Sequence, residues 1–288
     1  MPPYDLTKRV AEKADVIVAS YLYLLNPTIR ENFVSSLDVD YSDLVVVFDE
    51  AHNLPDQAIS ALSDRISIHT VNRAIKEADE YNEHEIANFL SVFGRGGLEI
   101  LHGGEKLGGD REIQETPVQP ELIFAHVLEV LRLDTRRLVR MLNDMISVGD
   151  AIREDRIEKG KPPRSYIGRI GEFLLLWLSL IGREDYLFLM SRDKGLSLEL
   201  VALDPSKALG FLKNVQSAVF MSGTLTPPLE AFRDVMGIEN ARMKKFPRMV
   251  KRENAQVLVA KDVSTRGGDE RSLQVYRRWW ITSSRRPW

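Results

Sequence analysis

Residues 44–54 read Leu-Val-Val-Val-Phe-Asp-Glu-Ala-His-Asn-Leu, an apolar run that ends in two carboxylates and a histidine. The run from Leu44 to Phe48 is rich in β-branched residues and too short for a helix, so it predicts a strand buried on both faces of a parallel sheet. Asp49 and Glu50 follow at the carboxyl end of that strand, where open α/β sheets bind their ligands. The stretch therefore predicts an α/β fold with a ligand-binding edge beginning at Asp49.

The two acids have a chemical and a structural interpretation. An Asp in this position can hold the Mg²⁺ that bridges the β- and γ-phosphates of a nucleotide, and a neighbouring Glu can orient or deprotonate the attacking water. His52 stands just beyond them. In the simpler interpretation, Asp49 and Glu50 cap the helix that follows, because both acids suit a helix start.

A second apolar segment ends in a small polar turn. Residues 218–221 read Ala-Val-Phe-Met, and residues 222–227 read Ser-Gly-Thr-Leu-Thr-Pro. This pattern predicts a second parallel strand that opens onto the same crevice. An ordinary strand-to-loop turn is the alternative.

Taken together, the two segments resemble known helicase motifs. Asp49-Glu50-Ala51-His52 matches the DEAH box of superfamily two helicases, and with residues 222–227 it resembles the XPD branch of the iron-sulfur DNA helicases, which includes the DinG-type enzymes. Residues 3–6, 14–21 and 257–260 also read like that family. The resemblance runs from residue 3 to about residue 278 and implies a RecA-like motor domain with a mainly helical arch insertion.

The resemblance also implies roles for individual residues. Asp49 would ligate the Mg²⁺ bound with ATP, Glu50 would activate water, and His52 would couple the nucleotide to the motor. The coupling would run through the second segment, by way of Ser222, Gly223 and Thr224. The implied activity is ATP-dependent unwinding with 5′→3′ polarity along single-stranded DNA.

Several features of the family are missing from this sequence. There is no cysteine, so disulfides, zinc-thiolate sites and a thiolate-held iron-sulfur cluster cannot form within the chain. There is no Gly-x-x-x-x-Gly-Lys-Ser/Thr phosphate loop. Nor does the chain continue through the second motor domain, which would carry an arginine of the ATP site. We therefore expect an internal fragment that lacks the phosphate loop, the cluster domain and most of the second motor domain.

The expected domain organisation follows the resemblance. Its segments are part of the first motor domain (1–55), an arch-like helical insertion (56–195), the return to the first motor domain (196–240), the start of the second motor domain (241–278) and an atypical tail rich in Arg and Trp (279–288). The tail fits either a basic aromatic patch for nucleic acid or the end of a frameshifted reading frame, and we prefer the second interpretation.

The first twenty residues predict a helix and a strand. Apolar residues at helical spacing favour a short amphipathic helix over Met1–Ala14, and Val16–Ala19 reads as a second buried strand. Tyr21 and Tyr23 follow, and they would either stack on bases of single-stranded DNA or serve packing.

The insertion is predicted to be mainly helical. Leu62 and Ile66 begin a helical period, Gly94–Pro120 reads as a loop, and Glu121–Met145 reads as one amphipathic helix. That helix would carry a basic stripe, either a solvated face or a phosphate-contacting one, formed by Arg132, Arg136, Arg137 and Arg140. Ile167–Ile181 predicts a core helix, and Tyr186–Met190 with Leu196–Leu203 predicts a hairpin.

Composition sets broad limits. The 288 residues are 44% hydrophobic and 28% charged with a net charge of −3, which suits a folded protein and neither demands nor excludes nucleic acid. No segment is long and apolar enough to span a bilayer and no signal peptide is evident, so we expect a cytoplasmic protein without a membrane partner.

Three hypotheses about function remain open from sequence. The chain could be part of a split helicase, completed by a separately encoded N-terminal piece that carries the phosphate loop. It could be a non-catalytic module that binds single-stranded DNA or protein through the arch. It could also be a decayed fragment with exposed strand edges.

Overall fold

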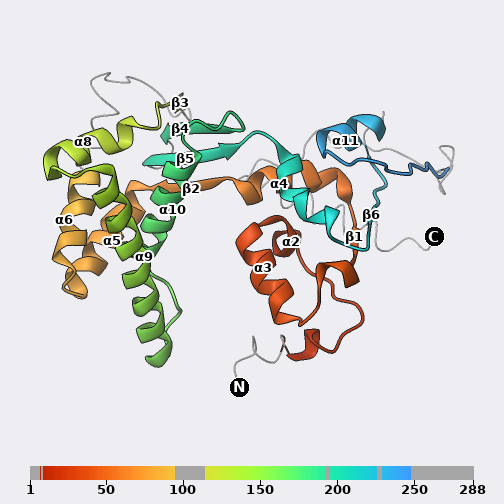
Figure 1. Cartoon of the computed structure of the whole chain (residues 1–288), viewed down its shortest axis with the longest axis horizontal. Coiled ribbons are helices and arrows are strands. Elements are labelled where there is room, and N and C mark those ends of the chain that lie inside the picture. Colours follow the sequence, from red (N-terminus) through yellow and green to blue (C-terminus); the bar gives the residue numbers. More distant parts are fainter. Residues whose placement is uncertain (1–6, 8, 95–113, 193–194, 226–228, 248–288) are drawn as a thin grey trace, which may run out of the picture. The chain divides into compact units, whose positions relative to one another are not determined.

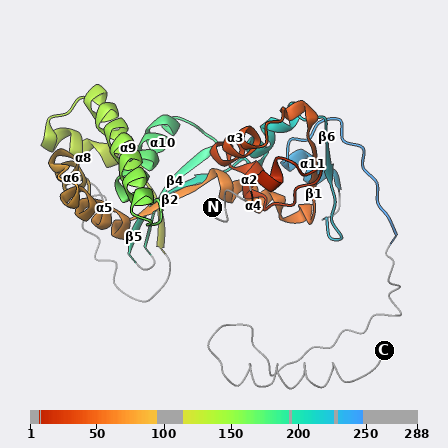
Figure 2. The same ribbon diagram turned by 90° about the horizontal axis from the view of Figure 1, so that it is seen from below.

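The computed structural model describes residue 7 and residues 9–94, 114–192, 195–225 and 229–247 (Figures 1 and 2). The chain divides into two compact units, residues 1–241 and 242–288. The described part of the second unit is limited to residues 242–247, so the fold below is that of the first. The predicted domains 241–278 and 279–288 therefore lie almost entirely outside the described residues.

The described residues form α-helices, 3₁₀ segments and strands. The α-helices are α2 (Leu22–Leu25), α3 (Pro27–Ser36), α4 (Leu54–Leu62), α5 (Ile68–Glu80), α6 (His84–Val92), α8 (Leu122–Leu131), α9 (Thr135–Glu158), α10 (Tyr166–Leu180) and α11 (Leu229–Val235). The 3₁₀ segments are η1 (Tyr41–Asp43), η2 (Ala51–Asn53) and η4 (Pro205–Lys213). The strands are β1 (Val45–Phe48), β2 (Asp64–Ser67), β3 (Gln114–Pro117), β4 (Tyr186–Arg192), β5 (Leu196–Ala202) and β6 (Ser217–Phe220).

The first sheet is a parallel pair, β1 with β6. Val45 lies opposite Ser217 and Phe48 lies opposite Phe220, so the two strands end together at the same edge. One face of the pair packs on α2, α4 and η4. The core there consists of Leu25, Val46, Phe48, Ala51, Leu54, Ala58, Ala208, Leu209, Phe211 and Met236. The predicted parallel strands and their shared carboxyl edge are confirmed.

Two predictions for this region are wrong. β1 is not buried on both faces, because Val45 and Val47 are 58% and 54% exposed while Val46 and Phe48 are buried. The described residues supply helices to one face of the pair only. Residues 16–19 form no strand, and Val18 is 95% exposed. A strand needs a neighbour for its backbone groups, and the described part of this sheet contains β1 and β6 alone.

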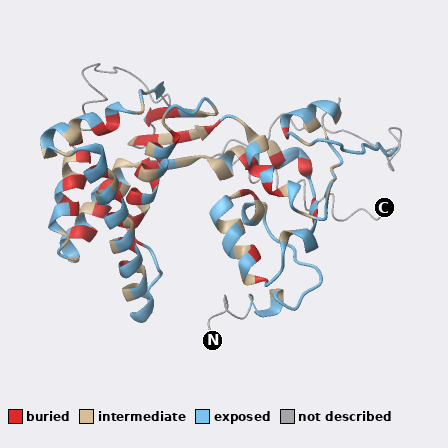
Figure 3. Cartoon of the chain, in the orientation of Figure 1, coloured by how far each residue is buried: buried red, intermediate tan, exposed pale blue. Residues whose placement is uncertain are grey.

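The second sheet is antiparallel, in the order β2-β5-β4-β3. Met190 lies opposite Leu198 and Phe188 opposite Leu200, so these four side chains share one face and bury it against the helices. We call residues 64–202 the helical lobe. Figure 3 shows its helices buried along the sides that face one another and exposed on the others. Trp177 of α10 fills the centre of the lobe. The centre of its ring lies 4.8 Å from that of Phe188, and its indole N–H donates to the Pro120 carbonyl.

Several predictions for the lobe are confirmed. α10 and the β4–β5 hairpin lie where the sequence predicts them. Outside the lobe, Thr7 and residues 9–11 are helical, within the range Met1–Ala14 that the sequence predicts as a helix. The predicted fold class is confirmed as well, since a parallel sheet is joined to a mostly helical insertion.

Other details of the lobe differ from prediction. Ile66 lies in strand β2 and not in a helix, and part of the predicted loop 94–120 forms strand β3. Residues 121–145 form two helices, because Arg132 adopts a left-handed conformation with φ 50° and ends α8. Asp134 then starts α9 by accepting a hydrogen bond from the Arg137 N–H at 2.8 Å. β5 pairs with β2 and β4, so the predicted boundary between residues 195 and 196 would separate β5 from two strands to which it is hydrogen-bonded. The domain boundaries stay predictions.

A buried carboxylate ties three helices of the lobe together. Glu77 of α5 is 2% exposed, and one of its oxygens accepts hydrogen bonds from the Ser165 hydroxyl and from the N–H groups of Tyr166 and Ile167. Its other oxygen pairs with Arg156 of α9 at 3.0 Å. The carboxylate therefore satisfies the first donors of α10, where a negative charge is favourable, and is itself fully paired.

Replacing Glu77 by Gln tests this arrangement. The amide oxygen can still accept from α10, but the amide NH₂ would face the Arg156 guanidinium, donor against donor. We expect a loss of about 1.5–3 kcal/mol in the free energy of unfolding, measured by denaturant titration. Glu80→Gln, on the exposed side of the same helix, is the matched control, and equal stabilities of the two variants would contradict the assignment.

Helices α9 and α10 cross at unusually close range. A Cβ built on Gly149 would lie 2.8 Å from the backbone nitrogen of Gly168, and one built on Gly171 would lie 3.0 Å from the Leu142 carbonyl oxygen. Backbone atoms cannot swing away as a flexible side chain can. The crossing therefore requires glycine at Gly149.

Gly149→Ala should destabilise the chain by about 1–3 kcal/mol through overpacking. For a protein of this size that lowers the melting temperature by several degrees, which circular dichroism at 222 nm would record. Gly210→Ala is the control, because an added Cβ there meets no atom within 4 Å. An unchanged melting temperature for Gly149→Ala would show that the two helices can move apart freely.

In the part of the chain that the structure describes, no helix is both long and apolar enough to cross a membrane.

Candidate functional site

Backbone hydrogen bonds extend the β1–β6 pairing beyond the ends of the strands. The Met221 N–H donates to the Phe48 carbonyl at 2.9 Å, and the Ala51 N–H donates to the Met221 carbonyl at 3.0 Å. Phe48 and Phe220 stack with their ring centres 5.0 Å apart beneath these bonds. The turn after β1 and the turn after β6 are therefore held side by side, although they lie about 170 residues apart in sequence.

The turn after β1 is tight and carries the two acids outward. Glu50 adopts a left-handed conformation with φ 50° and ψ 42°, and its N–H donates to the Asp49 carboxylate at 2.9 Å. A non-glycine residue in this region is uncommon and costs about 1–3 kcal/mol. The surrounding hydrogen bonds hold the turn in place, and η2 follows it with Ala51 buried and His52 exposed.

Four side chains meet at this edge, and we call them the acid–histidine cluster: Glu50, His52, Ser222 and Thr224. His52 Nδ1 lies 2.8 Å from Ser222 Oγ, 3.1 Å from Thr224 Oγ1 and 3.2 Å from Glu50 Oε2. The Ser222 hydroxyl also reaches Glu50 Oε2 at 3.4 Å, and the Thr224 N–H donates to Ser222 Oγ at 3.1 Å. The sequence expectation that His52 meets the second segment is thus matched by the geometry.

The contacts indicate which ring nitrogen of His52 carries hydrogen. An ionised carboxylate only accepts hydrogen bonds, so the approach of Glu50 to Nδ1 is favourable when Nδ1 carries the hydrogen. Nδ1–H then donates toward Ser222 or Glu50, and the Ser222 hydroxyl donates to Glu50. Nε2 is left for another partner.

The cluster is open to solvent and contributes little to stability. The side chains of Glu50 and His52 are 60% and 34% exposed, and ion pairs this exposed contribute at most about 1 kcal/mol. The fold therefore does not require these side chains at the edge, and their arrangement suits the binding of a ligand.

Asp49 and Glu50 suit a hydrated divalent cation. Mg²⁺ usually keeps several waters and takes one or two protein carboxylates, with substrate phosphates filling other positions, and both side chains here are exposed. Among the described residues, no group of three or more His, Cys, Asp or Glu side chains is arranged to enclose a metal ion. The acids thus fit a cation that shares its coordination with a ligand.

Tyr21 supports the turn, a contact that the sequence did not predict. Its ring packs on Phe48 at 6.1 Å between centres, and its hydroxyl donates to the Asp49 carbonyl across 28 residues. Burial, followed by the charges of Asp49 and Glu50, raises the pKa of the Tyr21 hydroxyl above its ordinary value. The hydroxyl therefore remains protonated at neutral pH and able to donate.

Tyr21→Phe keeps the ring and removes this donor. We expect a loss of about 0.5–1.5 kcal/mol in the free energy of unfolding, measured by urea titration. Tyr23→Phe is the control, because Tyr23 packs its ring on Phe33 at 5.0 Å and is 37% exposed. Equal effects of the two changes would argue against a supporting role for the Tyr21 hydroxyl.

The remaining predicted site residues lie apart from the cluster. Both tyrosines make packing contacts, which agrees with the simpler of their two interpretations, and stacking on bases stays a prediction. The four arginines of the predicted stripe are all exposed at α8 and α9 in the helical lobe, and the structure does not bring them to the cluster. Thr226 and Pro227 of the second segment lie outside the described residues.

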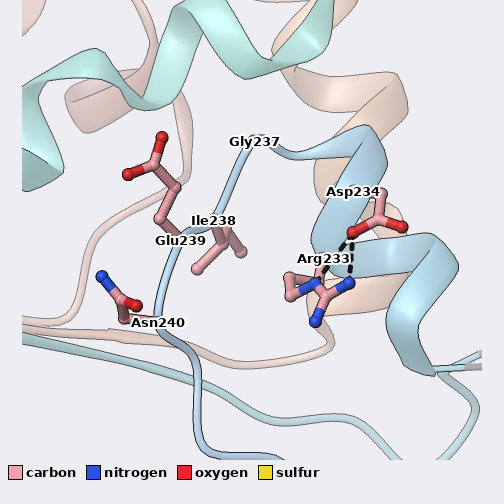
Figure 4. A pocket seen from close by; sticks show the side chains of 6 residues that line it. All are labelled: Arg233, Asp234, Gly237, Ile238, Glu239 and Asn240. Carbon is pink, nitrogen blue, oxygen red and sulfur yellow. Dashed lines mark hydrogen bonds and ion pairs between the residues drawn. The ribbon is translucent and has the colours of Figure 1, made fainter.

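A shallow pocket of about 520 Å³ lies at the C-terminal end of α11 (Figure 4). It is lined by Arg233, Asp234, Gly237, Ile238, Glu239 and Asn240. Arg233 is already paired with Asp234 at 2.7 Å. The pocket shares no residue with the acid–histidine cluster.

Two protein families match the chain. The model described as "Helical and beta-bridge domain" matches residues 74–269, more than half of the chain, and the model described as "DEAD_2" matches residues 1–71. This chain belongs to the XPD-type helicases. The two matches meet within α5, so the XPD-type sequence continues from the β1 region into the helical lobe.

Curated relatives and a solved structure agree with this family. The chain is 29% identical to "ATP-dependent DNA helicase XPD" of Sulfolobus acidocaldarius over 82% of its length, and 26% identical to "General transcription and DNA repair factor IIH helicase subunit XPD/RAD3" of Saccharomyces cerevisiae over 83%. A solved structure titled "XPD_Helicase" superposes with a TM-score of 0.57 at 25% identity, covering 82% of this chain and 36% of that one. The chain spans 36% and 30% of the two curated relatives.

Proposed function

We propose that this chain forms part of an ATP-dependent DNA helicase of DNA-repair type, in which the edge of β1 and β6 supplies the metal- and water-handling half of the ATP site. The observation that carries the proposal is the contact of His52 with Glu50, Ser222 and Thr224 at 2.8–3.2 Å. This contact links a pair of exposed carboxylates to a second segment of the chain. The names of the relatives, which are DNA helicases, support the substrate class.

In this proposal each residue has a defined role. Asp49 binds the Mg²⁺ that arrives with ATP, and Glu50 accepts a proton from the attacking water. His52 holds the Glu50 carboxylate and the Ser222–Thr224 turn in register, so that a change at the nucleotide moves the second segment. Asp49-Glu50-Ala51-His52 is then a DEAH box in function as well as in sequence.

These 288 residues contain no Gly-x-x-x-x-Gly-Lys-Ser/Thr motif, so in this proposal another segment of the helicase supplies the phosphate loop, and the second motor domain supplies the arginine. The loop would cradle the β- and γ-phosphates, and the arginine would stabilise the charge of the transition state by a factor of about 10³ or more. A separately encoded N-terminal piece of the helicase is one source of the loop. Movement would be 5′→3′ along single-stranded DNA, as the family resemblance implies.

Glu50→Gln is the direct test. We expect the chain alone to show no Mg²⁺-dependent ATP hydrolysis above the Glu50→Gln variant, with or without single-stranded DNA. After addition of a helicase piece that carries the phosphate loop, we expect DNA-stimulated turnover that falls at least about 100-fold in Glu50→Gln. Inorganic phosphate release provides the measurement.

Glu31→Gln, on the exposed surface of α3, is the matched control and should leave turnover unchanged. Turnover by the completed enzyme that survives Glu50→Gln would rule out the role of Glu50 as base. Turnover by the chain alone that is lost in Glu50→Gln would mean that the site is complete without an added loop.

A non-catalytic binding module is the alternative, and it has one specific observation behind it. The 288 residues hold no phosphate-loop motif but retain an exposed group of arginines on the helical lobe. Under this alternative the acid–histidine cluster catalyses no reaction, and binding of single-stranded DNA or protein survives when Asp49 and Glu50 are changed together.

A further inference from the structure

The connection between α8 and α9 concentrates unpaired positive charge. Four arginines lie within nine residues there, and we call them the arginine corner: Arg132, Arg136, Arg137 and Arg140. All four are exposed, and none forms an ion pair with a carboxylate of the described residues. The connection itself can be followed between the two helix labels in Figure 2.

Several other arginines of the helical lobe behave differently. Five of them form ion pairs within the lobe: Arg65 with Glu199, Arg153 with Asp150 and Glu172, Arg156 with Glu77, Arg169 with Asp64, and Arg183 with Asp185. The lobe therefore has carboxylates for its structural arginines. The corner is the place where several neighbouring arginines have been left without them, as far as the described residues show.

The corner also breaks two rules of helix stability. Arg136 and Arg137 occupy the first turn of α9, next to the positive end of the helix dipole, where acidic residues are preferred. The last turn of the same 24-residue helix carries charges of both signs, with Arg156 between Asp155 and Glu158. Two positive charges are thus placed against the helix dipole at the start of α9, which destabilises that end of the helix.

The second rule concerns Arg132. It ends α8 in the left-handed conformation with φ 50°, a position that glycine or asparagine usually occupies because a larger side chain is strained there. Its side chain has no partner among the described residues that would compensate. Natural sequences depart from local rules mainly at functional sites, and here both departures are arginines at the same corner.

The geometry indicates which of the arginines act together. On α9, Arg136 and Arg140 are four residues apart and so share one face. Leu138, Leu142 and Met145 are buried and lie on the opposite face, packed in the lobe. The arginines therefore point away from the core, and no side chain of the described lobe covers them.

We propose that the arginine corner binds the phosphate backbone of single-stranded DNA, independently of nucleotide at the acid–histidine cluster. The guanidinium group binds phosphate through two parallel hydrogen bonds. An exposed row of such groups contacts the charged backbone and does not distinguish one base from another. The choice of DNA as the polyanion rests on the proposed function. The assignment of the corner as a binding site rests on its unpaired arginines.

The test is salt-dependent binding of a fluorescein-labelled 30-mer of oligothymidylate to the full chain, followed by anisotropy without nucleotide. Each phosphate contact on a single strand contributes about −0.7 to the slope of log K against log[salt]. Arg136→Ala/Arg140→Ala should therefore reduce the slope by about 1.4 and weaken binding roughly 25-fold at 0.1 M salt. Arg136→Lys/Arg140→Lys should recover most of the slope, since the charge is restored.

Lys161→Ala/Arg164→Ala is the matched control, because it removes two exposed positive charges from the same lobe. It should leave the slope close to that of the wild-type chain. Since Arg136 opposes the helix dipole and Arg140 forms no ion pair with a carboxylate of the described residues, Arg136→Ala/Arg140→Ala should melt no lower than the control pair. A lower melting temperature would assign the arginines to the fold and overturn the proposal.

Other results would also overturn it. These are no binding by the wild-type chain at 0.05 M salt, equal losses in the corner and control pairs, or a corner variant that loses binding of a labelled polyglutamate peptide but keeps oligothymidylate. The last result would identify an acidic protein segment as the partner. Failure of the proposed ATP chemistry shows instead as absent turnover in the completed enzyme, so the two failures are distinguishable.

Discussion

The parallel pairing of β1 with β6 is the constraint on which the candidate site depends. It stacks Phe48 on Phe220 and continues through Met221 to Ala51, so that two turns far apart in sequence face each other. Closing so long a loop is opposed by chain entropy, although the penalty grows only slowly with length. The helical lobe lowers it further, because β2 leaves and β5 returns as hydrogen-bonded neighbours, and the Ala202 N–H donates to the Ser63 hydroxyl at the point where they part.

The helical lobe keeps its ends together because it has a core of its own. Its helices pack on one face of the antiparallel sheet, and Trp177, Glu77 and the α9–α10 crossing each join segments that are distant in sequence. The buried carboxylate is fully paired, so it fixes the start of α10 without leaving an unsatisfied charge. An insertion built in this way can be long and still leave the β1–β6 pair in register.

The residues that stabilise the fold are separate from the proposed functional sites in this molecule. The buried Glu77 carboxylate is fully paired, whereas the acid–histidine cluster is exposed, includes Glu50 in the left-handed conformation, and contributes little to the folding free energy. The arginine corner has the same character, with exposed charges and a left-handed Arg132. In both places the local rules for helices and turns are broken by residues that can bind an anion or a cation.

The sequence by itself determined the strand β1, the acids at its end, the turn at Ser222–Thr224 and the helix α10, because each of them depends on the spacing and chemistry of residues that are close in sequence. The fold family followed from the same motifs. Tertiary structure alone decided that Val45 and Val47 are exposed, that Tyr21 donates to Asp49, and that Glu77 receives the first donors of α10. Burial and long-range hydrogen bonds depend on which surfaces meet, and a periodic pattern carries no information about its distant partner. The break at Arg132 lies between these cases, since Asp134 signals a helix start but the apolar period continues across it.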